Sequence, residues 1–395
     1  MAGIYIHIPF CKSRCIYCGF YSTTATELRQ RYVDAVCEEV RCKRDEVSGE
    51  RIETIYIGGG TPSQLTIPQL RQLFEALTSH FSPLTSHLKE VTIEANPDDV
   101  TAEYAAALPQ LGINRVSMGA QTFDDQRLRF LNRRHTSAQV PQAVRHLREA
   151  GIGNISIDLM YGFPGETLAD WLRDIDAAIA LDVEHISAYC LMVEEGTPLQ
   201  QWTMDNGQWA MDEELERQMY ETLIDRLAEA GYEHYEISNF ARQKASPTGG
   251  GWRDGEETKA SPTGGGWRGL HNSSYWTDVH YIGIGAAAHS YDGRQRRWNV
   301  SDLRKYINGI ESGKPVFEFE DIDADTRYND RVMLSLRTKE GLDLLTLSEA
   351  ERDYLLPLAQ KYLDEGLLTR ADQHLRLSRK GLFVSNMIMS DLMKV

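Results

Sequence analysis

The stretch "IHIPFCKSRCIYCGFYS", residues 6–22, carries three cysteines at the spacing C-x3-C-x2-C. The three are Cys11, Cys15 and Cys18. Phe20 stands where a fourth ligand would follow. Structural zinc sites use four ligands in closed tetrahedral geometry, and four thiolates hold the clusters of electron-transfer proteins. Three thiolates leave one iron of a cubane open. The spacing therefore favours a [4Fe–4S] cluster that can bind a further ligand, with a zinc site completed by His7 as the weaker alternative.

The region from this loop to about residue 235 alternates strand patterns with helical patterns. Strands that run into turns are expected at residues 3–10, 52–60, 90–97, 115–121, 154–165 and 185–192. Six such β-then-α units form a parallel sheet, which is either doubly wound or curled into a barrel. The unusual motifs fall at the C-terminal ends of the strands, where barrels collect their chemistry. We therefore expect an α/β fold with a partial (β/α)6 TIM-like barrel.

The rest of the chain predicts a second, smaller domain. We expect a barrel at 1–235, a connection at 236–270, a segment closing the barrel at 271–320 and a C-terminal domain at 321–395. From residue 362 to 386 a helix, a glycine turn and a short hairpin follow one another. That order is typical of a winged helix, so we expect an α+β, winged-helix-like C-terminal domain.

The connection holds an internal duplication. "KASPTGGGWR" occurs at 244–253 and again at 259–268. Its glycine, proline, serine and threonine content is typical of a flexible exposed linker. Two copies are too few for a solenoid. Trp252 and Trp267 are the feature that keeps partner binding open as an alternative.

Composition excludes several classes of protein. The 395 residues carry a net charge of −16, which argues against nucleic acid as the main partner, because phosphate binding needs a basic face. No apolar run approaches the roughly 20 residues of a membrane span, and the N-terminus lacks the pattern of a signal peptide. Six cysteines in so long a chain do not form a disulfide framework. We expect a cytoplasmic protein without an integral membrane segment.

Polar motifs follow most of the predicted strands. They are "GGGTP" (58–62), "IEANP" (93–97), "GAQTF" (119–123), "LNRRH" (131–135) and "DLMYGFPGE" (158–166). Each alone is more often a turn, a cap or a surface group. Glycines, however, let a ligand approach the backbone closely. Polar groups on successive strands of one barrel together predict a mouth lined for a cofactor.

With the cysteine loop, these motifs resemble the radical S-adenosylmethionine (SAM) superfamily. The resemblance implies that the open iron chelates the amino and carboxylate groups of SAM. It also implies that one electron from the cluster cleaves the sulfonium to give a 5′-deoxyadenosyl radical. The SAM contacts that it implies are Tyr5, Tyr17, Gly59, Gly60, Thr61, Glu94, Gln121, Arg133, Asp158, Met192 and Ala288.

The order of the motifs resembles one family more closely. From residue 4 to about 385 it is similar to the coproporphyrinogen dehydrogenases, which carry out an oxygen-independent oxidative decarboxylation in porphyrin biosynthesis. Those enzymes carry a further cysteine at the position of Phe20 and an N-terminal extension that is not seen here. Both departures match the sister family of heme chaperones, HemW. That family has an HNxxYW motif, which is present as His271, Asn272, Tyr275 and Trp276.

The HNxxYW motif suits heme chemically. An imidazole can ligate heme iron, and tyrosine and tryptophan can pack on a porphyrin. The resemblance implies a heme site at these four residues, whereas the residues alone favour a polar loop and a core aromatic. Other candidate ligands are His7, His135 and His289.

The leading hypothesis is a chaperone that binds heme, a [4Fe–4S] cluster and SAM, and delivers heme to acceptor proteins. The main alternative is a coproporphyrinogen III dehydrogenase, against which Phe20 weighs; a radical enzyme with another substrate is a third. Whether SAM is turned over is left open. The expected partners are heme, heme-accepting apoproteins and a second copy in a homodimer.

Overall fold

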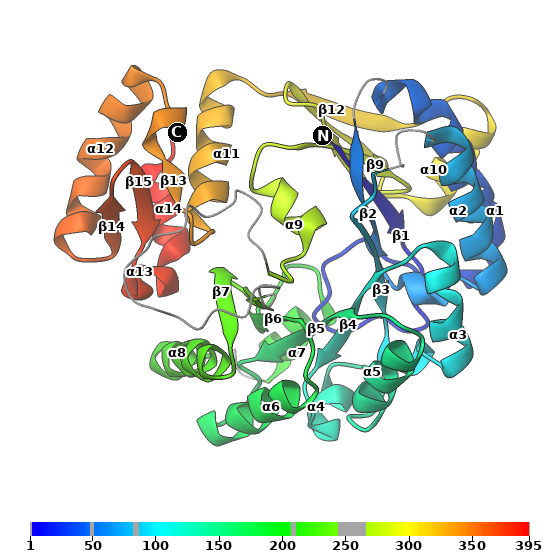
Figure 1. Ribbon diagram of the computed structural model, residues 1–395, viewed down its shortest axis with the longest axis horizontal. Helices are drawn as coiled ribbons and strands as arrows, with labels where there is room; N and C mark the ends of the chain where they lie inside the picture. Colours follow the sequence, from blue (N-terminus) through cyan, green and yellow to red (C-terminus); the bar gives the residue numbers. More distant parts are fainter. Residues whose placement is uncertain (1, 48–50, 82–86, 207–210, 244–265, 395) are drawn as a thin grey trace, which may run out of the picture.

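The computed structural model describes residues 2–47, 51–81, 87–206, 211–243 and 266–394 (Figure 1). Most of the predicted duplicated loop, including Trp252, lies outside these residues, so the prediction of a flexible linker stays a prediction. Within the described part, a large sheet with flanking helices is followed by a smaller unit at the C-terminal end (Figure 1).

The large sheet has twelve strands among the described residues, in the order β12-β11-β10-β9-β1-β2-β3-β4-β5-β6-β8-β7. Its first six strands are neighbours in chain order and run parallel. They are β1 (Ala2–Ile8), β2 (Ile52–Gly59), β3 (Glu90–Ala95), β4 (Arg115–Gln121), β5 (Asn154–Tyr161) and β6 (His185–Cys190). These bounds confirm the six predicted β-then-α units.

Alternation along each strand explains the two faces of this sheet. On β1, Ile4, Ile6 and Ile8 are fully buried in the main core under the outer helices, whereas Tyr5 and His7 point to the other, inner face, because successive side chains alternate. The outer helices are α1 (Arg29–Cys42), α2 (Ile67–Phe81), α3 (Ala102–Ala107), α4 (Asp125–Phe130), α5 (Gln139–Glu149), α6 (Leu168–Ala180) and α8 (Glu213–Glu229), whereas α7 (Pro198–Asp205) packs through Leu199 on Ile16. Figure 1 shows the outer helices outside a curled sheet, as predicted for a partial barrel.

Later strands extend the sheet at both edges. On one side, β8 (Asn239–Arg242) and β7 (Tyr232–Glu236) add to β6 in antiparallel fashion. On the other, β9 (His280–Ile284) pairs parallel to β1. Three antiparallel strands follow it: β10 (His289–Tyr291), β11 (Gln295–Asn299) and β12 (Phe317–Asp321). The short helix α9 (Leu270–Tyr275) lies on the inner side of the curled sheet, against β2 (Figure 1).

The C-terminal unit has its own hydrophobic core, built around Tyr328, Leu355 and Ile388. Its helices are α11 (Ala324–Leu336), α12 (Glu349–Asp364), α13 (Arg379–Phe383) and α14 (Ser385–Leu392), and α10 (Leu303–Glu311) precedes it in the chain. Its sheet has the order β13-β15-β14, with β13 (Leu342–Asp343), β14 (Leu368–Ala371) and β15 (His374–Leu377). The β14–β15 hairpin after α12 is the hairpin that the sequence predicts. Within the described residues, no helix combines the length and apolar character needed to cross a membrane.

Candidate functional site

The cysteine loop follows β1 and is held in place by backbone hydrogen bonds. The Cys11 N–H donates to the Thr23 carbonyl (2.9 Å) and the Thr23 N–H donates to the Pro9 carbonyl (2.7 Å), which closes the base of the loop. At its tip, the Ile16 N–H donates to the Leu131 carbonyl (3.2 Å). Ile16 also packs on a small apolar cluster that includes Leu199. The loop is therefore fixed at its base and its tip before any ligand binds.

The side chains of Cys11 and Cys15 contact different neighbours. Cys11 Sγ is buried 3.3 Å from Thr61 Oγ1, and Arg133 Nη1 donates to Cys15 Sγ (3.6 Å). Burial raises the pKa of Cys11 and of Cys18. Among the described residues, no three histidine, cysteine or acidic side chains converge on a single metal ion. A cubane needs no such convergence, because each thiolate binds a different iron, so this donor set fits a [4Fe–4S] cluster.

The glycines after β2 leave room that a side chain would fill. A Cβ on Gly59 would lie 2.6 Å from the His7 ring, and Gly59 has φ +116°, where side chains are strained. A Cβ on Gly60 would lie 2.7 Å from the Pro9 carbonyl and 3.1 Å from Cys11 Sγ. The GGGTP turn can therefore lie directly against the cysteine loop only with glycine at these positions.

Two carboxyl groups face the inside of the barrel behind this turn. Glu94 accepts hydrogen bonds from the Gly59 N–H (3.0 Å) and from the Tyr56 hydroxyl (2.7 Å). Burial, reinforced by the charge of Asp158, raises the pKa of Glu94 to about 7. Burial also raises the pKa of Asp158 to about 6, against the opposing effect of Arg115. Such perturbed carboxyl groups in a partly open interior are typical of binding sites.

The end of β4 carries strained backbone and a buried cation. Gln121 adopts φ +66°, a left-handed conformation that is uncommon outside glycine and that clusters at ligand sites. Arg133 donates to the Gly119 carbonyl (2.6 Å) and to the Asn96 side chain, while its Nε has no partner. This guanidinium therefore reaches from the inner strand ends to Cys15.

The remaining predicted SAM residues lie at different places around the cysteine loop. Tyr5 hydrogen-bonds through its hydroxyl with His7 Nδ1 (3.0 Å) on the inner face, and Tyr17 packs beside the tip of the cysteine loop. Ala288 is buried at the end of a turn after β9. Met192 is 64% exposed beyond β6. Hydrogen bonds directly join three pairs of the predicted residues: Cys11 with Thr61, Gly59 with Glu94, and Cys15 with Arg133.

His271 of the HNxxYW motif lies deep in the barrel, at the amino end of the strands. Its side chain is fully buried. Nδ1 is 2.8 Å from Thr54 Oγ1 and Nε2 is 2.9 Å from the Tyr275 hydroxyl. Its ring also stacks on Tyr56 at 5.3 Å. Burial lowers the pKa of His271 to about 3. Both ring nitrogens are therefore already engaged, and an axial bond to heme iron would have to replace one of these contacts.

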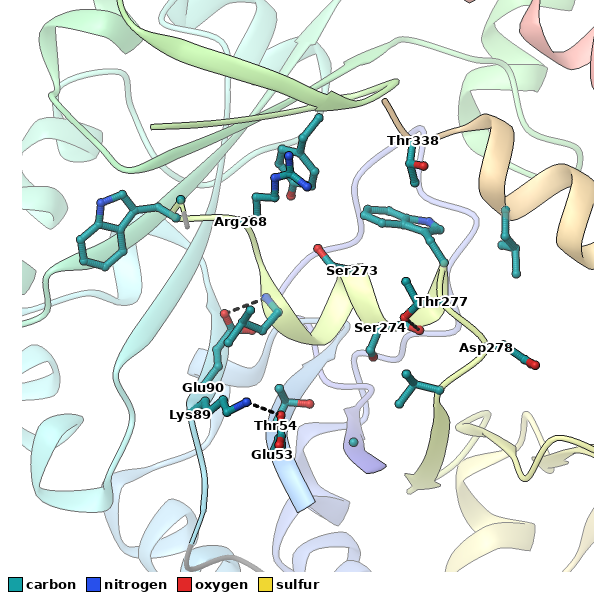
Figure 2. A pocket seen from close by; sticks show the side chains of 18 of the residues that line it. Glu53, Thr54, Lys89, Glu90, Arg268, Ser273, Ser274, Thr277, Asp278 and Thr338 are labelled. Atoms are coloured by element: carbon teal, nitrogen blue, oxygen red, sulfur yellow. Dashed lines mark hydrogen bonds and ion pairs between the residues drawn. The ribbon is translucent and has the colours of Figure 1, made fainter. Parts of the chain in front are cut away.

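The motif begins a helix whose first turn is capped from another strand. Glu90 at the start of β3 accepts from the Leu270 N–H (2.9 Å) and the His271 N–H (3.0 Å). A cavity of 1240 Å³ lies on this side of the barrel, and Trp276 is on its wall. Figure 2 shows this cavity with Glu90, Ser273 and Thr277 around it. Asn272 lines neither this cavity nor the one described next.

A second cavity, of 960 Å³, borders the cysteine loop. Tyr5, His7, Phe20, Tyr275 and His289 all contribute to its wall. Tyr275 is thus the member of HNxxYW that reaches toward the carboxyl ends of the strands. Phe20 is 74% exposed, so its ring lies open on this wall rather than packed in the core.

Sequence reasoning missed Arg115. It begins β4, where a charged residue predicts an exposed strand end, yet it is only 2% exposed. Its charge helps to lower the pKa of His271 and of His185 and opposes the rise for Asp158. No sequence signal marked it, because the polar inner face of a barrel has the same alternation as a solvent-facing strand.

Comparison with known proteins identifies the family. Residues 5–178 match the model of the radical SAM superfamily, and residues 322–384 match that of the HemN C-terminal domain. The chain is 34% identical to the heme chaperone HemW of Bacillus subtilis, over 98% of this chain and 97% of that protein. This chain belongs to the HemW family of radical SAM proteins. It is also 32% identical to HemW of Mycobacterium tuberculosis H37Rv, over 99% of this chain and 94% of that one.

A solved structure confirms the fold of this HemW-family chain. Coproporphyrinogen III oxidase (HemN) from Escherichia coli, a radical SAM enzyme, superposes with a TM-score of 0.82 at 22% identity. The match covers 100% of this chain and 90% of that one. At this identity the match concerns the fold alone. The predicted α/β radical SAM fold is therefore confirmed, and membership of the superfamily implies a [4Fe–4S] cluster and SAM.

Proposed function

We propose that this protein is a heme chaperone, which binds heme together with a SAM-coordinated [4Fe–4S] cluster and delivers the heme to heme-accepting apoproteins. The observation that carries the proposal is the 34% identity to a heme chaperone over nearly the whole of both chains. Phe20 supports it as well, because the coproporphyrinogen dehydrogenases that the sequence resembles carry a cysteine at this position.

In this proposal, Cys11, Cys15 and Cys18 hold the cluster, and SAM occupies the inner strand ends between Gly59 and Asp158. The donor set fits: Gly60 lets the GGGTP turn approach Cys11, and Arg133 offers an unpartnered Nε beside Cys15. When bound, the cluster supplies an open iron for chelation and an electron. Glu94 and Asp158 supply carboxyl groups for the cationic parts of SAM.

The heme-related role of HNxxYW is divided among its members. Tyr275 lines the cavity beside the cysteine loop, and Trp276 lines the cavity at the amino ends of the strands. His271 holds the Tyr275 hydroxyl through Nε2. We infer that His271 positions Tyr275 through this hydrogen bond. This role explains why the motif contains a histidine whose ring is buried.

Hemin titration of the anaerobically reconstituted protein, followed by Soret absorption, tests heme binding. The complex is then desalted and mixed with apomyoglobin, which tests heme transfer. We expect saturable binding and passage of heme to the acceptor, with no release of carbon dioxide from coproporphyrinogen III. Absence of hemin binding, combined with coproporphyrinogen III turnover that consumes SAM, would instead establish the dehydrogenase. Size-exclusion chromatography with and without SAM tests the homodimer in the same preparation.

A further inference from the structure

The cavity beside the cysteine loop has the size and the wall of a small-molecule site. Its 960 Å³ lies at the upper end of the range of about 300–1,000 Å³ usual for ligand pockets. Gly19 to Ser22, which follow the last cysteine directly, form one wall. The opposite sides come from Tyr275 and Tyr281 near β9, from His289 on β10 and from Met333 on α11. A ligand here would therefore border the loop that carries the three cysteines.

His289 differs from the other candidate heme ligands in its surroundings. His7 uses Nδ1 for the Tyr5 hydroxyl and Nε2 for the Tyr21 carbonyl, both at 3.0 Å. His135 is 2% exposed and bonded to the Ala120 carbonyl. His271 has both nitrogens bonded. Only a histidine with a free, reachable nitrogen can ligate an added iron without losing a contact.

The His289 ring meets both conditions. It is exposed at the start of β10, on the cavity wall. It stacks on Trp298, with 5.7 Å between ring centroids and 25° between planes, which sets the ring orientation without engaging a nitrogen. Among the described residues its ring makes no hydrogen bond. Burial, together with the nearby Arg296, lowers the pKa of His289, which favours the neutral ring with a lone pair for a metal.

The rest of the wall suits a porphyrin. Phe20, Tyr281 and Met333 offer flat and apolar surface for a macrocycle. The charges on the wall are mostly paired: Arg296 pairs with Asp330 and Glu320, and Asp278 accepts from the Tyr291 hydroxyl. Arg14 is exposed on this wall and has no ion pair among the described residues. It is the cation available for a propionate, which arginine binds through a bidentate fork.

We propose that heme binds in this cavity with the His289 imidazole as its axial ligand, with Arg14 on a propionate. This inference rests on the proposed function, because it assigns where the heme of that function binds. His271 is then a positioning residue: it fixes the hydroxyl of Tyr275, whose side chain forms part of the cavity wall. Loss of His271 weakens heme binding without removing the bond to iron.

The test combines hemin titration of the reconstituted protein with resonance Raman spectroscopy of the heme complex after dithionite has reduced its iron to the ferrous state. Wild type should show an iron–histidine stretching band. His289→Ala should lose that band, weaken hemin binding ~10-fold or more, and regain imidazole ligation when free imidazole is added. His271→Ala should bind more weakly but keep the band. His87→Ala, exposed outside the cavity, is the matched control and should equal wild type. Arg14→Ala should weaken binding and keep the band.

Retention of the band by His289→Ala with its loss in His271→Ala would overturn the proposal and make His271 the ligand, while leaving the chaperone function in place. Failure of wild type to bind hemin would overturn both. Iron content, sulfide content and SAM binding equal to those of wild type show that the fold of a variant is intact. We expect this result for His289→Ala, because His289 is exposed.

Discussion

The two ends of the same barrel strands use their polar residues differently. At the carboxyl ends, Gln121 has a left-handed backbone and Arg133 keeps an unpartnered Nε beside the cysteine loop. At the amino ends, both nitrogens of His271 and both carboxylate oxygens of Glu90 are bonded within the protein, although Arg115 Nε and Ser273 Oγ have no partner there. Strained backbone and unmet bonds mark a place for ligands, whereas the fully bonded ring of His271 and carboxylate of Glu90 hold α9 in the barrel.

The largest expected effect is the loss of the cluster when a cysteine of the loop after β1 is removed. Cys15→Ala should abolish the brown colour and the broad visible absorption of reconstituted protein, because two thiolates cannot hold the cubane. Iron and sulfide analysis checks it. Cys42→Ala, exposed at the end of α1, is the control and should keep full cluster content. Full iron content in the Cys15 variant would refute the three-cysteine site.

Alanine substitutions at two glycines distinguish backbone strain from steric conflict beside the cysteine loop. Gly59→Ala and Gly112→Ala both place alanine at positive φ, which costs ~1–2 kcal/mol each. Only at Gly59 does the new Cβ meet an obstacle, the His7 ring at 2.6 Å; Gly112 has open space. We expect Gly59→Ala to lose ~1–3 kcal/mol more free energy of unfolding and to bind SAM poorly. Urea denaturation and calorimetric SAM titration measure this, and equal losses in the two variants would show that His7 moves aside freely.

The fully bonded His271 ring predicts a structural effect without a cluster effect. His271→Ala removes a fully buried ring and leaves Thr54 and Tyr275 without their partners, so we expect a loss of ~2–4 kcal/mol in unfolding free energy. Thr54→Val removes one bond only and should lose ~1 kcal/mol. Cluster content should stay at the wild-type level in both. Loss of the cluster in either variant would mean that the two ends are not separable.

The most gradual expected effect is a pH dependence from Glu94. Its pKa is raised from 4.5 to about 7 in the folded protein, so between these values the folded state binds more protons than the unfolded state. Stability of the ligand-free protein should therefore fall as pH rises from 4.5 to about 7, by at most ~1.4 kcal/mol per pH unit. The difference in unfolding free energy between wild type and Glu94→Gln across this window isolates the effect. A flat difference would show that the carboxyl group is ionised throughout.

The sequence alone was sufficient for the fold class and the family. Strand and helix periods are local, so the six β-then-α units could be predicted from residues near in the chain. The cysteine spacing is equally local. The prediction that the glycines of GGGTP permit close approach agrees with the short distances that a Cβ at Gly59 or Gly60 would have to its neighbours. The family followed from motifs in a constant order, and the full-length comparison bears it out.

Only the tertiary structure decided which polar residues are open to a ligand. His271 and His289 are both polar-motif histidines in the sequence, but packing of α9 inside the barrel saturates one, and the turn from β9 to β10 leaves the other at a cavity. The burial of Arg115 could not be predicted for the same reason, because it depends on residues from other strands. Burial and hydrogen bonding depend on residues that are distant in the chain, and a local pattern contains no information about which distant groups will meet.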